Sequence, residues 1–588
     1  MARTVAIGEQ DFAKLIEQDY FYIDKTAFIK EWWENGDTVT LITRPRRFGK
    51  TLTMRMAEQF FSVKYAGRED LFENLKIWEE EKYRKLQGTY PVIFLSFADV
   101  KESDYPQTRK KICSTVKELY HQYLFLLDGD LLSESEKRDF QSISPDMEDY
   151  EASGSVKALC RYISRYYKKK VIILLDEYDT PMQEAYINGF WDELISFIRS
   201  MLNSTFKTNP YLERGIMTGI TRVSKESIFS DLNNLETAAV TSRKYETAFG
   251  FTEPEVLEAL EEYQLSGRAG EVRRWYDGFR FGECGSIYNP WSITKFLDNR
   301  EFKPYWANTS SNRLVAGLVR RSGIDVKLIM EGLLQGGSFC TPMDEEVVYA
   351  DLDSKKSALW SLLLAGGYLK ILRTAKNRRG KTEYELTLTN MESCFVFDEM
   401  VTGWFSSSRL SCSDFSDALL AGDKKHMNEY LNAIAMETFS FFDTGMEPSG
   451  HRQPENFYHG FVLGMIADLR EVYRITSNRE SGNGRYDVLL EPRDPQADDG
   501  IIIEFKVLDP KREKSLEDTV QTAVRQILDK KYASGLEMKC SRDRIRVYGI
   551  AFRGKNILVD GGILSEIENE TDNVMSGSWQ RGSAWQEQ

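Results

Sequence analysis

Four nearly continuous apolar runs within the first 245 residues constrain the fold of this chain more than any other feature. They occupy residues 38–42, 92–97, 171–175 and 215–220. Such runs are typical of strands that are buried on both faces of a parallel sheet. The stretches between them have helical periodicity, as in Leu52–Phe61, where Leu52, Met56 and Phe60 recur at a spacing of four. The sequence therefore predicts an α/β domain in which helices cover a parallel sheet.

The rest of the chain is predicted to form further domains, because 588 residues exceed what one hydrophobic core usually supports. Amphipathic helices such as Glu253–Tyr263 and Leu419–Phe442 predominate from about residue 246, with a small helix-plus-hairpin unit across Leu359–Arg373 and Glu383–Leu388. The later α/β pattern consists of a helix at Phe457–Leu469, strands at Tyr486–Leu490 and Ile501–Val507, a helix at Leu516–Tyr532 and a strand at Ile545–Phe552. We expect a first domain over 1–245, a helical lid or connector over 246–440, a second α/β domain over 441–570 and a disordered tail over 571–588.

The composition indicates the cellular compartment of the protein and argues against disulfide and zinc sites. No apolar run approaches the ~20 residues that span a bilayer, and the first residues lack the apolar stretch of a secretory signal. The seven cysteines are scattered and the four histidines have no metal-ligand spacing, so neither a disulfide framework nor a zinc hydrolase is expected. These features favour a cytoplasmic protein without a membrane partner. The net charge of −14 argues against a surface that is basic all over.

A glycine-containing loop follows the first apolar run and precedes a predicted helix. Its sequence, Arg44-Pro-Arg-Arg-Phe-Gly-Lys50-Thr51, resembles the phosphate-binding pattern G-x-x-x-x-G-K-[ST], except that Arg44 replaces the first glycine. In that pattern the backbone amides cradle phosphates, the lysine contacts the β and γ groups, and the hydroxyl binds Mg²⁺. A basic surface turn before a helix is the alternative. The predicted nucleotide-binding residues are Arg46, Arg47, Phe48, Gly49, Lys50, Thr51 and Leu52.

Two later strands end in residues that would complete such a site. The run Val171–Leu175 leads into Asp176 and Glu177, which could hold Mg²⁺ and activate a water, respectively. A plain helix cap is the other interpretation of Asp176. After residues 215–220, Thr218 or Thr221 could sense a γ-phosphate and Arg222 could stabilise its charge, unless Arg222 only pairs with a surface carboxylate.

A second candidate site lies near the C-terminus. Asp487 opens one predicted strand, and Glu504 and Lys506 share one face of the next because side chains alternate along a strand. Two carboxylates can hold Mg²⁺ while a lysine orients or deprotonates a water, which is a minimal site for phosphodiester hydrolysis. Glu455 is a further candidate ligand and Gln526 a candidate contact. An E-x-K pattern is also common on solvated strand faces.

The charge around this site suits a polyanionic substrate. Between Ile501 and Asn556 there are 13 lysines and arginines against 8 acidic residues, a local excess of +5. A nucleic acid, with DNA favoured, is therefore the expected partner of the C-terminal domain.

These motifs together resemble those of a bacterial family with an N-terminal AAA-ATPase-like domain and a C-terminal domain of the PD-(D/E)XK nuclease superfamily. The resemblance covers almost the whole chain and rests on Tyr22–Thr26, Arg44–Thr51, Leu175–Asp179, Thr218–Arg222, Phe229–Asn234, Tyr276–Phe279, Tyr288–Trp291 and Asp487 with Glu504–Lys506. It implies ATP binding at Lys50 and Thr51, a metal site at Asp487 and Glu504, and Lys506 as the catalytic lysine. Tyr22 and residues 24–26 stand where relatives would contact or cover the nucleotide base, although an amphipathic lead-in explains them equally well.

Two main classes of function follow, and a third, weaker one is an ATPase whose rear domain is purely structural. The first is a P-loop ATPase, a hydrolase of phosphoanhydrides, joined to a Mg²⁺-dependent nuclease. The second is a nucleotide-switched binding or signalling protein whose rear domain binds without cutting. Because AAA-like sites often use an arginine from a neighbouring subunit, a homo-oligomer is a further expectation, and roles in defence or mobile elements are suggested for relatives.

Overall fold

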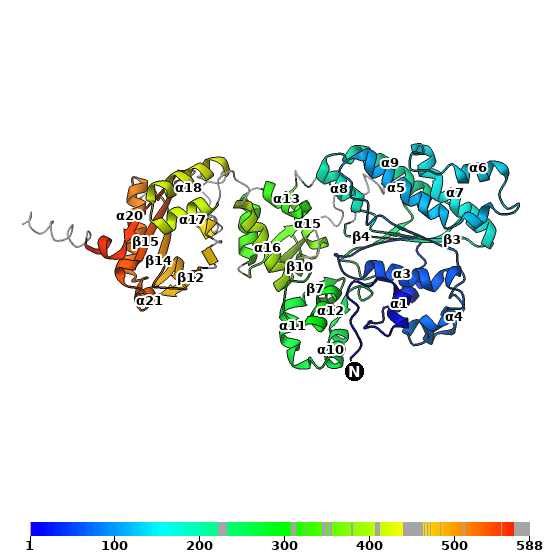
Figure 1. Cartoon of the computed structure of the whole chain (residues 1–588), viewed down its shortest axis with the longest axis horizontal. Helices are drawn as coiled ribbons and strands as arrows, with labels where there is room; N and C mark the ends of the chain where they lie inside the picture. The colour runs from blue at the N-terminus through cyan, green and yellow to red at the C-terminus, as the bar shows by residue number, and fades with distance from the viewer. Residues whose placement is uncertain are drawn as a thin grey trace, which may run out of the picture. The chain divides into compact units, whose positions relative to one another are not determined.

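The computed structural model describes residues 2–221, 232–306, 313–405, 412–438 and 462–569, with short gaps inside 313–405 and 462–569. The chain divides into two compact units (Figure 1). Unit 1 comprises residues 1–321 and 333–396, and unit 2 comprises residues 322–332 and 397–588. Arg222, Glu455, the first part of the helix expected at Phe457–Leu469 and the tail 571–588 lie outside the described residues.

Unit 1 is built on a parallel sheet with the strand order β2-β3-β4-β1-β5. The strands are β1 (Val39–Thr43), β2 (Val92–Ser96), β3 (Val171–Asp176), β4 (Leu212–Gly219) and β5 (Leu235–Ala238). All of β1 and β3 is buried, as the apolar runs predict. The predicted strands are thus confirmed to within a few residues, and β5 is an additional strand beside β1.

Helices cover both faces of this sheet. They are α1 (Phe12–Glu17), α2 (Ala27–Asn35), α3 (Lys50–Phe61), α4 (Glu81–Arg84), α5 (Tyr105–His121), α6 (Glu134–Gln141), α7 (Asp149–Tyr167), α8 (Thr180–Asn188) and α9 (Trp191–Leu202). Figure 1 shows α5, α7 and α9 on one side of the sheet and α1, α3 and α4 on the other. An aromatic-rich core that includes Trp32, Phe60 and Phe72 lies beneath α1, α2 and α3. The strands are therefore held firmly enough for their carboxyl ends to position a site.

The region after residue 246 is predominantly helical, as periodicity predicts, and it also contains strands that the sequence did not mark. It has two small antiparallel sheets, β6-β8-β7 and β10-β11-β9. Their strands are β6 (Phe251–Thr252), β7 (Phe279–Phe281), β8 (Cys284–Tyr288), β9 (Phe339–Pro342), β10 (Leu369–Lys376) and β11 (Thr382–Leu388). The helices are α10 (Glu253–Glu262), α11 (Ala269–Tyr276), α12 (Pro290–Asn299), α13 (Arg313–Arg321), α14 (Ile324–Leu334), α15 (Lys356–Ala365) and α16 (Met391–Phe405). The predicted helix-plus-hairpin unit is α15 followed by β10 and β11.

One predicted helix of the connector is interrupted. Instead of a continuous helix over Leu419–Phe442, the structure has α17 (Cys412–Ala421) and α18 (Lys424–Thr438). Gly422 lies between them with a φ of 74°. Because this left-handed conformation ends a helix and suits glycine, a single helix was the wrong prediction here.

Unit 2 contains a mixed sheet with the order β12-β13-β14-β15-β16. The strands are β12 (Tyr473–Ser481), β13 (Gly484–Pro492), β14 (Gly500–Val507), β15 (Ile545–Arg553) and β16 (Asn556–Ile563), and the helices on its second face are α20 (Leu516–Asp529) and α21 (Ser534–Glu537). One core packs α17 and α18 against the sheet, and another packs α20 and α21 against the opposite face. The result is a three-layer α/β domain. Its α/β class is the one that the later pattern predicts.

The outer edge of β16 is covered by side chains of α18. The Asn428 side chain donates to the Val559 carbonyl and accepts from its amide, both at 2.8 Å. Asn432 repeats the arrangement with Ile557, at 2.7 and 2.9 Å. Two asparagines thus satisfy backbone groups that an edge strand otherwise leaves open. Among the helices that the structure describes, none combines the length and the apolar character needed to cross a bilayer.

Candidate functional site

The first site lies where β1, β3 and β4 end at the same edge of the parallel sheet, the usual place for a ligand in such sheets. The loop 44–49 leaves β1 and leads directly into α3, which begins at Lys50. Arg47 and Gly49 have φ values of 65° and 80°, so the loop makes a tight turn just before the helix. The amide of Arg44 donates to the Gly219 carbonyl at 3.2 Å, which ties the start of the loop to the end of β4.

The Lys50 ammonium is buried in the centre of this loop. It donates to the carbonyls of Arg44 and Pro45, each at 3.2 Å, and lies 3.6 Å from the Glu177 carboxylate. Its side chain is 3% exposed. The loop therefore bends around one positive charge at a helix N-terminus, which is an arrangement suited to an anion.

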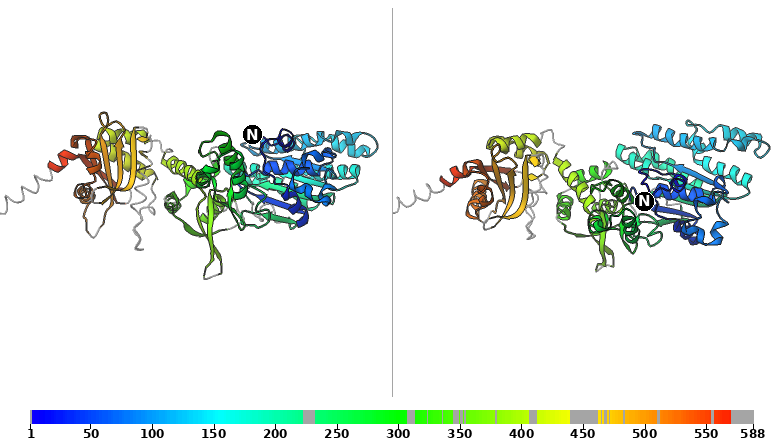
Figure 2. Two further views of the ribbon diagram at one scale, coloured as in Figure 1. Left: turned by 90° about the horizontal axis from the view of Figure 1, so that it is seen from below. Right: turned by 60° about the horizontal axis from the view of Figure 1, so that its bottom comes forward.

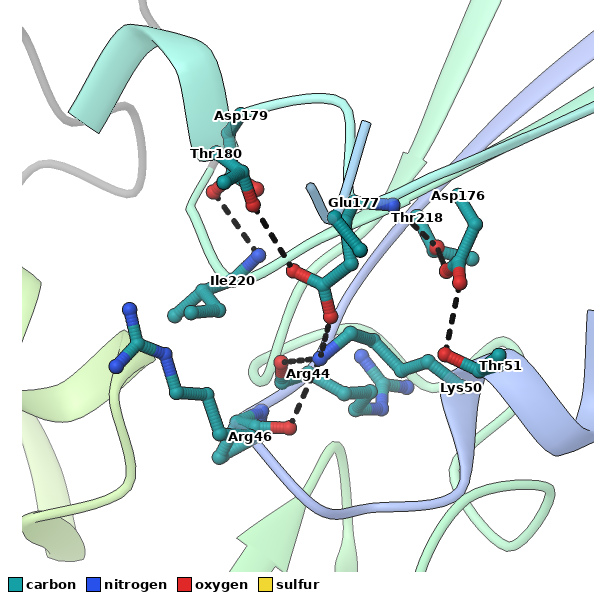
Figure 3. Close-up of polar contacts among 12 residues, drawn as sticks. Arg44, Arg46, Lys50, Thr51, Asp176, Glu177, Asp179, Thr180, Thr218 and Ile220 are labelled. Atoms are coloured by element: carbon teal, nitrogen blue, oxygen red, sulfur yellow. Dashed lines mark hydrogen bonds and ion pairs between the residues drawn. The ribbon is translucent and has the colours of Figure 1, made fainter. Parts of the chain in front are cut away.

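Thr51, Asp176 and Thr218 meet beside Lys50 (Figure 3). The Thr51 hydroxyl donates to Asp176 Oδ2 at 2.7 Å, and the Thr218 hydroxyl donates to Asp176 Oδ1. Burial and the neighbouring Glu177 raise the pKa of Asp176 above its usual range, against the effect of the two hydroxyls and Lys50. These hard oxygen atoms are the kind of ligand that Mg²⁺ takes, so Thr51 and Asp176 fit the expected metal.

Glu177 is held in an unusual backbone conformation next to these groups. Its φ is 51°, which is uncommon for a residue other than glycine and is found often at functional sites. The Thr218 hydroxyl lies 3.4 Å from the Glu177 amide, and the Thr180 hydroxyl reaches Glu177 Oε2 at 3.5 Å. The carboxylate thus faces Lys50 and is 22% exposed, so a water can reach it.

A cavity of about 650 Å³ opens in front of the loop. Lys50, Thr51, Asp176 and Glu177 line it together with the predicted Arg46, Arg47, Phe48, Gly49 and Leu52. Its remaining walls include residues 6–10 of the N-terminal segment, which the sequence did not single out. The Phe48 ring is buried against Phe279 and Phe281, with ring centroids 4.8 and 5.3 Å apart. Phe48 is thus anchored from behind, while residues on either side of it face the cavity.

The segment Tyr22–Thr26 has mainly structural contacts. Asp24 accepts from Thr26 and from the amide of Lys76 at 2.8 Å. The Lys25 ammonium pairs with Glu255 at 2.7 Å. Tyr22 and Lys25 also line the cavity. The segment therefore builds one wall of the cavity and joins it to α10.

Arg44 has a role that the motif did not reveal. Its guanidinium is completely buried and donates to the carbonyls of Thr43, Ala238 and Ala239 at 2.9 Å and to those of Tyr245 and Lys244 at 3.2 and 3.4 Å. Burial lowers the pKa of Arg44 to about 9. The residue in place of the first glycine thus fastens the loop to β5 and to the chain after it.

Asp179 forms a second buried connection behind the site. Its Oδ2 atom accepts from the amides of Ile220 and Thr221, both at 3.0 Å, and from the Thr221 hydroxyl at 2.9 Å. A Cβ atom at Gly219 would lie 2.7 Å from the Asp179 carboxylate, so only glycine permits this approach. Thr221 is therefore engaged with Asp179, whereas Thr218 contacts Asp176 directly.

The carbonyl of Arg46 is held by residues far along the chain. Asn289 donates to it at 3.3 Å and the Trp306 indole at 3.2 Å. The Trp306 amide in turn donates to the buried carboxyl of Glu392 at 3.0 Å, and the Ser292 hydroxyl lies 2.8 Å from the same carboxyl. Glu392 is on α16, so the loop after β1 is linked to that helix through Trp306.

A glutamine at position 392 is expected to change the pH dependence of stability. Burial raises the pKa of Glu392 to about 8 from a usual value of 4.5. The folded protein therefore keeps this proton where the unfolded chain loses it, and the stabilisation, full below pH 4.5, disappears as the pH rises to about 8. Glu392→Gln should equal the wild type near pH 5 and exceed its free energy of unfolding by roughly 2–4 kcal/mol near pH 8. Denaturant titrations at both pH values, with the exposed Glu258→Gln as the control, measure this; parallel curves for wild type and Glu392→Gln would contradict it.

The second site lies in unit 2, where β13 and β14 pair. The amide of Phe505 donates to Asp487 Oδ2 at 2.8 Å, and the amide of Asp487 lies 3.4 Å from Glu504 Oε2. Glu504 is 3% exposed and Phe505 is buried in the core. Burial, with the nearby Asp487, raises the pKa of Glu504 well above its usual range, and Lys506 opposes that effect. The structure thus brings the predicted Asp487, Glu504 and Lys506 together.

Gln526 on α20 completes this site. Its side-chain amide donates to Glu504 Oε1 and reaches the Tyr532 hydroxyl at 3.3 Å. Within the described part of the chain, no three His, Cys, Asp or Glu side chains are placed to share a metal. Asp487 and Glu504 are two hard oxygen donors, which fit Mg²⁺ with water or substrate as the further ligands.

The parallel sheet with its phosphate-type loop and buried aspartate defines a P-loop nucleotide-binding class of domain, followed in the same chain by a nuclease-type α/β domain. Residues 6–229 match the family described as Predicted AAA-ATPase, and residues 453–561 match the PD-(D/E)XK nuclease superfamily. The chain therefore carries an AAA-ATPase-like domain and a PD-(D/E)XK nuclease-superfamily domain, which confirms the resemblance and the fold class inferred from its motifs.

One relative is a protein of Azotobacter chroococcum mcd 1 described as an uncharacterized protein in vnfD 5'region. It is 30% identical over 324 residues, which cover 54% of this chain and 56% of the relative. The chain thus spans about half the length of that protein.

Proposed function

We propose that this protein binds and hydrolyses ATP in unit 1 and that this activity is coupled to a Mg²⁺-dependent nuclease domain acting on nucleic acid, with DNA favoured. We also propose that the protein is cytoplasmic, that it forms a homo-oligomer, and that its domains are separated at residues 245, 440 and 570. The observation that carries it is the meeting of Lys50 with the Thr51–Asp176 pair on one wall of a 650 Å³ cavity. That cavity has the size range of small-molecule and cofactor sites.

Each residue of the first site has a separate task in this proposal. The amides of the loop and the Lys50 ammonium bind the phosphates. Thr51 and Asp176 would hold Mg²⁺, which supplies charge neutralisation between phosphate groups. Glu177 accepts the proton of an attacking water. Thr218 donates to Asp176 and thereby keeps the Asp176 carboxylate oriented. Arg222 or an arginine of a second copy would balance the charge that develops on the γ-phosphate.

In unit 2, Asp487 and Glu504 would hold the metal and Lys506 would orient or deprotonate the attacking water. Support comes from the shared position of the three side chains at the β13–β14 pairing and from the +5 charge of residues 501–556. The alternative is a nucleotide-switched protein that binds nucleic acid without cutting it. The observation that favours this alternative is the Gln526 amide on Glu504, which occupies one oxygen of a predicted ligand.

The test separates the two sites by single substitutions. Lys50→Ala should weaken ATP binding by about 10- to 100-fold, because a buried charge-assisted contact with the phosphates is lost. It should leave metal-dependent cleavage by unit 2 detectable without ATP. Lys506→Ala should abolish cleavage of labelled DNA and keep ATP binding. Titration with a fluorescent ATP analogue and gel analysis of duplex DNA, single-stranded DNA and RNA measure both properties.

Two exposed lysines provide the controls. Lys111→Ala in unit 1 and Lys425→Ala in unit 2 remove the same charge away from either site and outside residues 501–556. Unchanged ATP binding in Lys50→Ala would reject the nucleotide site. An intact protein that binds DNA and cuts none of the substrates would reject the nuclease in favour of the binding protein.

A further inference from the structure

The hairpin Leu369–Leu388, formed by β10 and β11, projects from unit 1 (Figure 2). From Leu372 to Lys376 every residue of β10 is exposed, so both faces of this strand contact solvent. A strand that packs on a core instead alternates between buried and exposed positions. We call Leu369–Leu388 the basic hairpin because most of its charged residues are lysines and arginines.

Every charged residue from Leu369 to Lys381 is basic, in a chain whose net charge is −14. Arg373 is paired with Glu385 of the opposite strand, and Lys370 is half-buried, with the Asp277 carboxylate nearby. Lys376 and Lys381 are exposed and form no ion pair with another described residue. The far half of the hairpin therefore presents the positive charges of Lys376 and Lys381, unpaired among the described residues, while the carboxylate of Glu383 there accepts from Asn377.

Charged residues also protect edge strands against pairing, and this is the plain explanation of a lysine on β10. That purpose is served by either sign of charge, whereas here one sign extends along the strand and through the turn. A two-stranded ribbon is also barely stable by itself. In this hairpin, β9 pairs along β11 and the Ser338 hydroxyl donates to Glu385 at 2.6 Å, so the ribbon is reinforced on one side. The whole hairpin has six basic residues against two acidic ones, Glu383 and Glu385 of β11. A reinforced, solvent-exposed ribbon with this excess of positive charge is better explained by an anionic partner.

We propose that the basic hairpin is an arm of the nucleotide-binding unit that contacts double-stranded DNA. The pairing of β9 with β11 ends at Glu383, so the part of the basic hairpin beyond that residue is two-stranded. A two-stranded ribbon fits the major groove of B-form DNA, whereas the corresponding groove of double-stranded RNA is too narrow for side chains to enter. Lys376 and Lys381 would contact phosphates and thereby position the ribbon. This arm goes beyond the proposed nuclease, because it binds DNA through unit 1 and needs no cleavage.

The experiment compares two double variants of the full chain. Lys376→Ala with Lys381→Ala removes both exposed charges of the basic hairpin, and Lys111→Ala with Lys207→Ala removes two exposed charges elsewhere on unit 1. Fluorescence anisotropy with a labelled DNA duplex of about 30 base pairs, without divalent metal, gives affinity as a function of salt. We expect the hairpin variant to bind about 10-fold more weakly at ~0.1 M salt, with the slope of log K against log salt reduced by about 2.

The control variant should bind like the wild type, and equal ATP-analogue binding by both variants shows that unit 1 is folded. Wild-type affinity and slope in the hairpin variant would overturn the proposal. An equal loss of binding to double-stranded RNA or to single-stranded DNA would overturn the assignment to duplex DNA. Failure of the proposed nuclease would appear separately, as absent cleavage with hairpin-dependent binding intact.

Discussion

Glu177→Gln should slow ATP turnover by about 100- to 1,000-fold while ATP still binds. A glutamine fills the same space but cannot accept a proton from a water. The carboxylate lies 3.6 Å from Lys50, in a backbone conformation with a φ of 51° that aims it across the loop. In the proposed site the phosphate contacts come from the loop amides and Lys50, and the substitution changes neither of them. Steady-state phosphate release and binding of a fluorescent ATP analogue measure the two effects separately.

The exposed Glu193→Gln on α9 is the matched control, since it makes the same chemical change outside the cavity. Its turnover should equal that of the wild type. If Glu177→Gln released phosphate at the wild-type rate, Glu177 would not be the base. A parallel loss of ATP binding would assign Glu177 to the support of Lys50 instead.

Arg44→Met should reduce the free energy of unfolding of unit 1 by about 4 kcal/mol and weaken ATP binding as well. Methionine removes the desolvation cost of the guanidinium, but it leaves buried carbonyls of residues 43, 238, 239 and 245 without their donor. Stacking of the guanidinium on the Phe281 ring, 4.6 Å away, is lost with it. Denaturant unfolding followed by tryptophan fluorescence, together with ATP-analogue titration, measures both losses.

Arg214→Met is the comparison for this substitution. Arg214 also donates to two carbonyls, those of Trp32 and Trp33 at 3.1 and 2.8 Å, but it is only partly buried and lies away from the loop. Arg214→Met should lower the free energy of unfolding by about 1 kcal/mol and leave ATP binding unchanged. Wild-type stability in Arg44→Met would refute the anchoring role of Arg44.

The buried parallel strands could be predicted because their apolar character is local. Val171–Asp176 is buried at every position, so its sequence alone reveals its state. The strands after residue 246 are different. In β8 the first residues are exposed or half-buried and only Ile287 and Tyr288 are buried, so no apolar run marks the strand. These strands form because distant partners pair with them, and a short window of sequence does not contain that information.

The residues of the candidate sites likewise fall into those that a short sequence pattern reveals and those that it does not. Lys50, Thr51 and Asp176 belong to short patterns at strand ends, and the order of the strands brings them to one edge. Arg44 and Glu392 could not be recognised in advance, because their partners are far away in sequence. Arg44 donates to a carbonyl 201 residues later, and Glu392 accepts from an amide 86 residues earlier. Such contacts depend on the whole packing of unit 1.

The asparagine cover on β16 restricts how copies of this protein can join. Asn428 and Asn432 already use the amides and carbonyls of Val559 and Ile557, so no incoming strand can pair there. Among the described strands of unit 2, β12 at the opposite margin is therefore the one from which a continuous intermolecular sheet could grow. The two edges of this sheet therefore differ, because at Val559 and Ile557 two asparagine side chains protect the β16 edge against pairing with another chain.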